Sequence, residues 1–320
     1  MSTPTDANKK TYVLALVAAT ILVGLIAFWV KDRPPQTANG FSGARAMQHV
    51  EALVGFGPRP AGSQALEESR QYIERELATS GWTVERQAFT KTTALKGKVQ
   101  FVNLRARYSP GATDIAWDDG GGMVVVASHY DTKWYADFEF LGANDSGSST
   151  GALIEMARVL AQDDPDMATK IELVFFDGEE AFGENITDID GLYGSHYYAR
   201  ALWRPKPAGQ KPSLGILLDM IGDRDLVVTP PTNSDPELVR LTLDVAEELG
   251  YGAHFEPGTI AITDDHVPLM LEARFPAIDL IDFEYGGAWH TRHDTLDRLS
   301  PESLEIVGQV TVEMLRRLLE

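Results

Sequence analysis

Four short, almost uninterrupted apolar runs alternate with stretches of helical periodicity, and this alternation constrains the fold of the 320-residue chain most strongly. The apolar runs lie at 123–129, 171–176, 214–220 and 276–281. Helical patterns lie at 147–161, 192–203, 235–249, 265–273 and 301–319. Strands without a polar face are buried on both sides. The sequence therefore predicts a three-layer α/β sandwich, with a central, mostly parallel mixed sheet flanked by helices.

The region before these runs contributes further elements to the predicted fold. Residues 43–80 have a helical pattern that is broken at 55–63 by the glycine- and proline-rich sequence GFGPRPAGS. Two strand-like stretches follow at 82–90 and 98–107.

Side chains suited to catalysis follow the apolar runs, at the carboxyl ends where open α/β sheets bind ligands. His129 and Asp131 end the first run, and Asp219 lies near the end of the third. The other candidates lie in the loops or at helix starts, and they are Asp145, Asp177, Glu179, Glu180, Asp264, Asp265, His266, Trp289 and His290. Because parallel strands end at one edge of a sheet, these residues are expected to form a single site.

Each of these groups also has an ordinary structural explanation. The pair Glu179–Glu180 could be a solvated charged face, His129 a hydrogen-bonded core histidine, and Asp145 the N-cap of the next helix. In a functional interpretation, one glutamate of the pair ligates a metal and its neighbour acts as an acid or base. Asp131 would then orient the His129 ring. The shared position of the groups at strand ends favours the functional interpretation.

Composition limits the chemistry further. The chain has no cysteine, which excludes a disulfide scaffold, a thiol nucleophile, an iron–sulfur cluster and a thiolate zinc site. A ligand set of carboxylates and histidines fits Zn²⁺, with other divalent metals left open. The net charge of −19 argues against nucleic acid as a partner. No phosphate-binding loop or dinucleotide fingerprint occurs, and GSSTG at 147–151 lies at a helix start, where small residues permit close packing.

An uncharged apolar stretch of 19 residues, Tyr12–Val30, precedes all of these features. About 20 residues span the hydrocarbon core of a membrane, and aromatic residues favour its interfaces. A buried core helix and a cleaved signal peptide are alternatives, but FWVKDRPP offers no small-residue cleavage site. We therefore predict a short N-terminal tail at 1–11, a retained transmembrane signal-anchor at 12–30, a linker at 31–43 and a catalytic α/β domain at 44–320.

The order of seven motifs resembles that of the zinc aminopeptidase-like clan, and within it most closely the animal-type glutaminyl-peptide cyclotransferases (glutaminyl cyclases). The motifs are SHYD, GANDSGSSTGALIEMARVL, IELVFFDGEEAF, DGLYGSHYYA, LLDMIGD, DDHVPL and WHTRHDT, and they cover roughly residues 43–320. Three details favour the cyclotransferases over the aminopeptidases: the insertion Gly183–Asp190 before GLYGS, and the forms of LLDMIGD and DDHVPL. The resemblance implies the zinc-aminopeptidase-like fold.

The resemblance also implies a role for individual residues. Asp145, Glu180 and His290 would bind one catalytic Zn²⁺ per chain, and Glu179 would be the proton shuttle. The remaining implied positions are an acidic network of Asp219 and Asp264, a substrate pocket of Trp289, Ile262 and Tyr285, and second-metal or supporting positions at His129 and Asp131.

Two departures from the cyclotransferase pattern concern the shape of the pocket. A pocket tryptophan expected soon after the glutamate pair is missing, and the sequence there is GENITDID. Asp279 stands where the animal enzymes have a histidine below the DDH motif. We also expect Asp219 and Asp264 to raise the pKa of Glu179 by like-charge repulsion.

The implied reaction converts the N-terminal glutamine of peptides or proteins to pyroglutamate, with release of ammonia. The alternative is a di-zinc aminopeptidase in which Glu179 is the general base, and a third hypothesis is a non-catalytic binding ectodomain. The catalytic domain is expected to be monomeric and exported on its membrane anchor. A sequon at Asn144, beside the predicted ligand Asp145, and the absence of cysteine favour a bacterial periplasm over a Golgi or secretory lumen.

Overall fold

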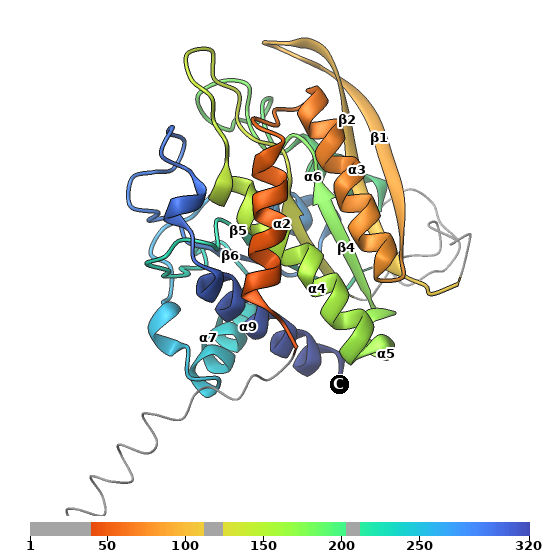
Figure 1. The fold of residues 1–320 in the computed structure, drawn as a ribbon, viewed down its shortest axis with the longest axis vertical. Helices are drawn as coiled ribbons and strands as arrows, with labels where there is room; N and C mark the ends of the chain where they lie inside the picture. Colours follow the sequence, from red (N-terminus) through yellow and green to blue (C-terminus); the bar gives the residue numbers. More distant parts are fainter. Residues whose placement is uncertain (1–39, 112–123, 203–211) are drawn as a thin grey trace, which may run out of the picture. The chain divides into compact units, whose positions relative to one another are not determined.

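The computed structural model describes residues 40–111, 124–202 and 212–320 (Figure 1). The predicted tail at 1–11, the signal-anchor at 12–30 and most of the linker at 31–43 lie outside the described residues. Within the described ranges, none of the helices has the length and apolar character that a membrane span requires.

Six strands form one sheet in the order β1-β2-β4-β3-β5-β6. The four apolar runs become the parallel strands β3 (Val124–His129), β4 (Ile171–Phe176), β5 (Leu214–Asp219) and β6 (Ala277–Ile281). The hairpin of β1 (Trp82–Thr93) and β2 (Gly97–Tyr108) joins the sheet antiparallel to β4. The predicted mixed α/β sheet is therefore confirmed.

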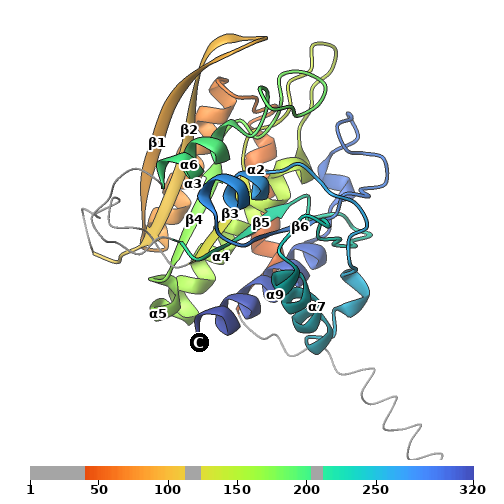
Figure 2. The ribbon, with the colours of Figure 1, turned by 180° about the vertical axis from the view of Figure 1, so that it is seen from behind.

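Helices cover both faces of this sheet (Figures 1 and 2). Most of them lie on one face: α2 (Gly43–Gly55), α3 (Gln64–Thr79), α4 (Ser149–Asp163), α5 (Pro165–Ala168) and α9 (Pro301–Leu319), with α7 (Pro236–Glu248) packed on α9. The other face carries α6 (Tyr193–Ala201), α8 (His266–Pro268) and the adjoining turn η3 (Leu269–Ala273). Alternate residues of β3 enter different cores, Val126 under α4 and Val125 under α6, which explains the unbroken apolar runs.

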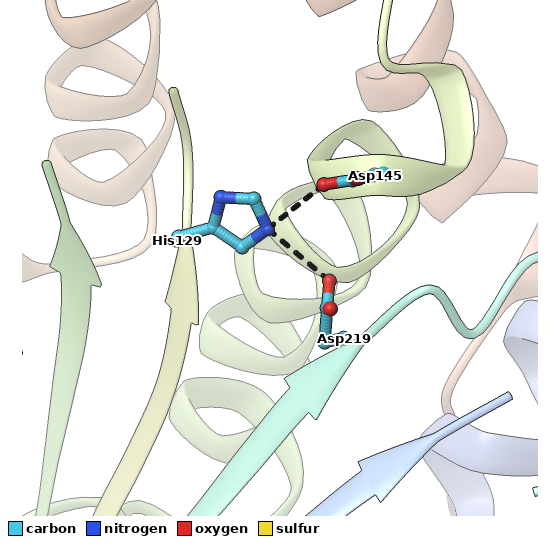
Figure 3. A group of neighbouring side chains, drawn as sticks. All are labelled: His129, Asp145 and Asp219. Carbon is cyan, nitrogen blue, oxygen red and sulfur yellow. Dashed lines mark hydrogen bonds and ion pairs between the residues drawn. The ribbon is translucent and has the colours of Figure 1, made fainter. Parts of the chain in front are cut away.

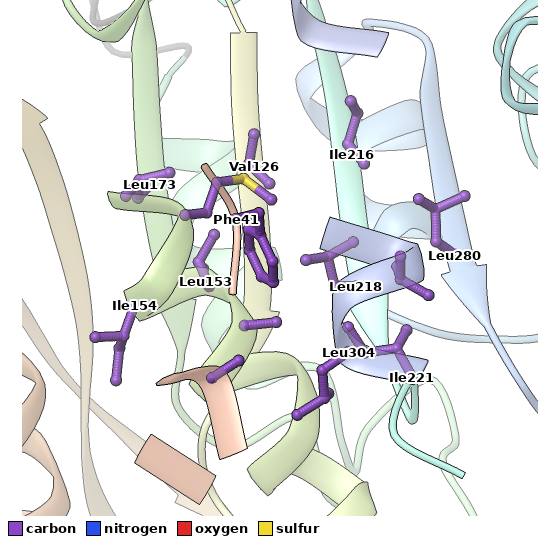
Figure 4. Close-up of a cluster of buried hydrophobic side chains, with 14 of the residues drawn as sticks. Phe41, Val126, Leu153, Ile154, Leu173, Ile216, Leu218, Ile221, Leu280 and Leu304 are labelled. Carbon is purple, nitrogen blue, oxygen red and sulfur yellow. The ribbon is translucent and has the colours of Figure 1, made fainter. Parts of the chain in front are cut away.

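Phe41 ties the start of the domain to the larger core, among the side chains drawn in Figure 4. Its side chain is buried against Gly308 of α9, where an added Cβ would come within 2.3 Å of the ring. Ser42 caps α2 by accepting a hydrogen bond from the amide of Arg45. The last three residues of the predicted linker, 41–43, are therefore part of the fold.

Three further short helical segments connect these elements: η1 (Ala143–Ser148), η2 (Gly252–His254) and η4 (Leu296–Arg298). The most important for the site is η1, which leads from the loop after β3 into α4. Its glycines and those of α4 allow close packing, because an added Cβ at Gly151 would meet Val50 and the carbonyl of Ala46 in α2 at 2.7 and 2.8 Å. The small residues of GSSTG thus serve helix packing, as predicted.

Candidate active site

The carboxyl edge of the parallel strands brings the predicted metal ligands together. His129 is the last residue of β3 and Asp219 the last of β5, while Glu180 lies in the loop after β4. Asp145 comes from η1, and His290 from the loop after β6. Five separate segments therefore contribute to one site, and each of these side chains except His290 is buried.

Asp145 lies at the centre of this group and faces a histidine on each side. Its Oδ1 is 3.2 Å from Nε2 of His129, which is also 3.2 Å from Oδ1 of Asp219 (Figure 3). Its Oδ2 is 3.3 Å from Nε2 of His290, and that nitrogen is 3.3 Å from Oε1 of Glu180. One carboxylate thus belongs to two triads, Asp145–Glu180–His290 and His129–Asp145–Asp219.

Both triads have the composition and spacing of metal-binding groups. In each, one ligand atom per residue lies within 4.8 Å of the others. Oε1 of Glu180 is buried, and within the described part of the chain its one close polar neighbour is Nε2 of His290, at 3.3 Å and without the geometry of a hydrogen bond. Two buried carboxylates that converge on one imidazole leave negative charge that a cation would neutralise, so the predicted triad of Asp145, Glu180 and His290 fits a divalent metal.

The charges of these side chains depend strongly on one another. Burial raises the pKa of Asp145, but His129 and His290 lower it more strongly and hold this pKa below the ordinary value. Burial lowers the pKa of His290, but the carboxylates of Glu180 and Asp145 outweigh it and raise this pKa to about 9. The site is therefore a cluster of negative charge that attracts protons or metal cations.

Asp131 lies beside His129, as the H-x-D spacing predicts, but it does not hydrogen-bond the ring. Its carboxylate lies 3.6 Å from Nδ1 of His129, an ion-pair distance that is too long for a hydrogen bond. It accepts hydrogen bonds from the backbone amides of Glu179 at 3.2 Å and Glu180 at 3.4 Å. Asp131 thus holds the backbone of the glutamate pair, because the turn after β4 directs both amides at the end of β3.

Glu179 lies beside the triads with little exposure to solvent, at 8% of its full surface. Burial raises its pKa well above the ordinary value; His129 opposes this shift, and Glu180 and Asp264 reinforce it. The predicted upward shift therefore occurs, but burial is its largest cause and Glu180 replaces Asp219 among the charges responsible. A carboxyl group with such a pKa is suited to carrying a proton near neutral pH.

A group of buried acids adjoins Glu179 on the α8 side of the sheet. Burial raises the pKa of Asp219 to about 7, with His129 opposing and Asp264 reinforcing the shift. Burial also raises the pKa of Asp279 well above its ordinary value, reinforced by Asp264 and Asp219. The nearest histidine is His266, with Nδ1 3.8 Å from Asp279. These acids act on one another electrostatically, so the predicted pair of Asp219 and Asp264 belongs to a buried acidic network that includes Asp279.

A small cavity of about 50 Å³ opens onto the triads. Ile262 and Trp289 line it, as the resemblance implied, and the Trp289 ring stacks on His290 at a centroid distance of 4.1 Å. Ile186, from the GENITDID stretch that lacks the expected tryptophan, also lines the cavity. The side chain of Phe283 completes this wall and lies against Trp289.

The predicted pocket residue Tyr285 does not line this cavity. Its side chain is fully buried in the larger core, and its hydroxyl donates to Oδ1 of Asp294 at 2.9 Å. The two oxygens of Asp294 in turn accept the amides of Asn144 at 2.7 Å and Asp145 at 3.1 Å. Tyr285 and Asp294 therefore position the loop that carries Asp145.

Two other functional side chains were not predicted. Lys133 is buried, with Nζ 3.4 Å from Oε2 of Glu180 and 3.0 Å from the carbonyl oxygen of Ala181. Arg59 is also buried and donates to the carbonyls of Leu141 and Gly142, directly before η1. Lys133 lies two residues after the HYD motif, and this position at the end of β3 could have indicated that it belongs to the site. Arg59 lies in a loop without any such sequence signal.

Comparison with known proteins agrees with this geometry. Residues 103–315 match the model of peptidase family M28. The glutaminyl-peptide cyclotransferase of Drosophila melanogaster is 28% identical over 276 residues, which cover 78% of this chain and 75% of that protein.

Solved structures give the same result. The glutaminyl cyclase of Porphyromonas gingivalis has a TM-score of 0.75 and 32% identity, covering 87% of this chain and 99% of its own. A Zn-dependent exopeptidase from Parabacteroides distasonis has a TM-score of 0.75 and 27% identity, covering 86% of this chain and 98% of its own. The resemblance to glutaminyl-peptide cyclotransferases is thus confirmed, and the chain belongs to peptidase family M28.

Proposed function

We propose that this enzyme is a zinc-dependent glutaminyl-peptide cyclotransferase that acts on peptides or proteins with N-terminal glutamine. The observation that carries the proposal is the position of Glu179 beside the Asp145–Glu180–His290 triad, at a cavity lined by Trp289. The similarity to glutaminyl cyclases supports the reaction class. All positions expected of the clan hold a suitable side chain, which argues against a non-catalytic binding domain.

Asp145, Glu180 and His290 would hold one Zn²⁺, which supplies a Lewis acid that polarises the side-chain amide of the substrate glutamine. The cavity wall aligns the two ends of that glutamine, since its α-amine must reach its own side-chain carbonyl carbon. Lys133 neutralises part of the charge on Glu180 and fixes its orientation.

Glu179 performs the proton transfer in this reaction. The α-amino nitrogen forms a bond to the amide carbon, and the Glu179 carboxylate accepts the proton that this nitrogen loses. Glu179 then delivers the proton to the amide nitrogen, the carbon–nitrogen bond breaks, and ammonia leaves. The product is a peptide with N-terminal pyroglutamate. Burial, together with the charges of Glu180 and Asp264, keeps the pKa of Glu179 high enough for this exchange.

Mass spectrometry of a glutamine-initiated peptide incubated with the purified chain tests this function. The expected result is loss of ammonia with all other residues retained, and no reaction with an alanine-initiated control peptide. Release of free glutamine would show hydrolysis of the first peptide bond and contradict the proposal.

A second candidate function, a di-zinc aminopeptidase, has one observation in its favour. Asp145 also belongs to the second triad, His129–Asp145–Asp219. A carboxylate shared by two triads is what a site for two metal ions would require. In that enzyme Glu179 would act as general base toward water. Metal analysis separates the two functions, because one zinc per chain fits the cyclotransferase and two fit the aminopeptidase.

A further inference from the structure

A second, larger cavity of about 700 Å³ lies next to the active-site cavity. Phe283 lines both cavities, and its ring lies 5.0 Å from that of Trp289. The loop that supplies Ile262 to the active-site cavity supplies Ile260 to the larger one. A substrate chain that leaves the active site past Phe283 therefore enters this second cavity.

The walls of the larger cavity are strongly acidic. Six carboxylates line it: Asp223, Asp225, Glu256, Asp282, Glu284 and Asp297. Two guanidinium groups also line it, but both bind backbone carbonyls, Arg224 that of Asp297 at 2.7 Å and Arg298 that of Gly286 at 3.5 Å. Among the residues that the structure describes, no ion pair joins either arginine to a carboxylate of the cavity.

Asp223 makes this cavity more than an acidic surface. Its side chain is buried, with 8% exposed, and its carboxylate has no hydrogen bond or ion pair within the described ranges. Beside it, the buried carboxylate of Asp282 accepts hydrogen bonds from backbone donors, among them the amide of Val227 at 3.1 Å. Burial raises the pKa of Asp282 to about 6, and the charge of Asp223 contributes to the shift. Two buried, mutually repelling carboxylates are stabilised when a cation binds between them.

The arrangement of the carboxylates favours an organic cation over a metal ion. The described groups whose ligand atoms converge within 4.8 Å are the two triads of the active site, and neither includes a residue of this cavity. The cavity has room for a long side chain, and an extended peptide advances about 3.3–3.6 Å per residue. A lysine or arginine of a peptide already held at its first residue satisfies both conditions.

We infer that this acidic cavity, defined by the six carboxylates above, binds a basic side chain of the peptide substrate, downstream of its N-terminal residue. The inference rests on the proposed function, since it takes the first residue of the peptide to lie in the active-site cavity. Asp223 and Asp282 form the floor that pairs with the ammonium or guanidinium group. Exposed Asp225 and Glu284 lie at the rim.

Peptides of the form Gln-Ala-Ala-Ala-Ala-amide, with one lysine moved through positions 2 to 5, test this subsite on the full-length chain. Acetyl-lysine at the same position is the control, because it keeps the length of the side chain and removes its charge. At one position we expect lysine to raise kcat/KM roughly tenfold over acetyl-lysine, mainly through KM, since one buried ion pair is worth about that factor. Added salt should reduce the difference.

Variants of single carboxylates test whether the preference for lysine arises in this cavity. Asp223→Asn should abolish the preference for lysine and leave the rate on the all-alanine peptide unchanged, and Glu284→Gln at the exposed rim should weaken it. Glu68→Gln removes the same charge from α3, which packs on β1 at the opposite edge of the sheet, and should leave the preference intact. Circular dichroism confirms that each variant is folded.

Several outcomes would overturn the inference: equal rates for lysine and acetyl-lysine at every position, a preference for glutamate, or a preference that survives Asp223→Asn. If no glutamine peptide is cyclised, the proposed function fails, and calorimetric binding of the lysine and acetyl-lysine peptides decides the subsite separately. Equal affinities in that measurement would refute it.

Discussion

Asp145 offers one carboxylate oxygen to each of two histidines, and its neighbours fix this orientation. The amides of Asn144 and Asp145 are held by Asp294, and Arg59 holds the carbonyls just before them. The site therefore depends on residues that never contact a substrate.

Glu179→Gln tests the proton transfer directly. The amide keeps the size of the side chain but cannot accept the proton, so we expect kcat to fall by roughly 10²–10⁴-fold. Bound zinc should remain at the level of the unmodified enzyme, measured by elemental analysis. Glu184→Gln, in the exposed loop nearby, is the matched control and should retain full activity. Unchanged turnover in the Glu179 variant would exclude the shuttle role.

Asp294→Asn tests the support of Asp145. One of its two acceptors is lost, and an unpaired buried amide costs about 1–3 kcal/mol, so we expect lower thermal stability, weaker zinc binding and lower activity. Tyr285→Phe removes only the hydroxyl bond to Asp294 and should cost about 0.5–1.5 kcal/mol. Urea denaturation and zinc titration measure both effects. A Tyr285 variant with weakened peptide binding at normal stability would instead place this residue in the substrate pocket.

The residues that could be predicted are those whose chemistry depends on their place along the chain. Asp145, Glu180 and His290 follow buried strands, and the topology of a parallel sheet brings such positions together. Tyr285 was placed wrongly because the direction of its side chain depends on the conformation of the loop after β6. The roles of Arg59 and Asp294 could not be predicted, because they arise from contacts across the fold that no local pattern encodes.

At the scale of elements, the sequence predicted the parallel strands closely, since a run buried on both faces leaves an unbroken apolar pattern. The antiparallel hairpin of β1 and β2 extends beyond the predicted stretches at 82–90 and 98–107 because its far end is polar and exposed. The helical pattern at 265–273 divides into α8 and η3, and both segments pack against α6.

Gly151→Ala tests the contact between α4 and α2. The new methyl group would clash with Val50 and the backbone of Ala46, so we expect a loss of about 1–3 kcal/mol in the free energy of unfolding. Gly55→Ala at the end of α2 is the control, because nothing lies within 4 Å of the added atom. It should be neutral or stabilising by up to about 1 kcal/mol. Equal effects of the two changes in urea denaturation would contradict this packing.

At the scale of the whole molecule, the apolar stretch at 12–30 predicts that the full-length chain is retained in membranes. We expect the full chain in the membrane fraction of expressing bacteria and a chain starting at residue 34 in the soluble fraction, with the same activity. External protease applied to spheroplasts should digest the catalytic domain if it is exported. Full-length chain released without a membrane, or protected from protease, would contradict the anchor or its orientation.

Metal content and thermal stability should change together. His290→Gln removes a ligand of the proposed zinc triad, so we expect loss of bound zinc and a melting temperature that no longer responds to a chelator. His129→Gln lies in the other triad and should retain one zinc per chain. Elemental analysis and thermal denaturation with and without chelator measure these effects. Loss of zinc in both variants, from two ions to one or none, would favour the di-zinc enzyme.

The three proposed ligands lie 35 and 110 positions apart in the chain, in loops that meet only after the sheet has formed. An unfolded chain offers no such triad, so zinc held by these residues would bind the native state alone and shift the folding equilibrium by mass action. At a free concentration 100 times the dissociation constant, this shift is about 2.7 kcal/mol. The fraction of folded enzyme in a cell would therefore depend on the supply of free zinc in its compartment. Starvation for the metal would remove the protein as well as its activity, because the less stable metal-free chain is exposed to proteolysis.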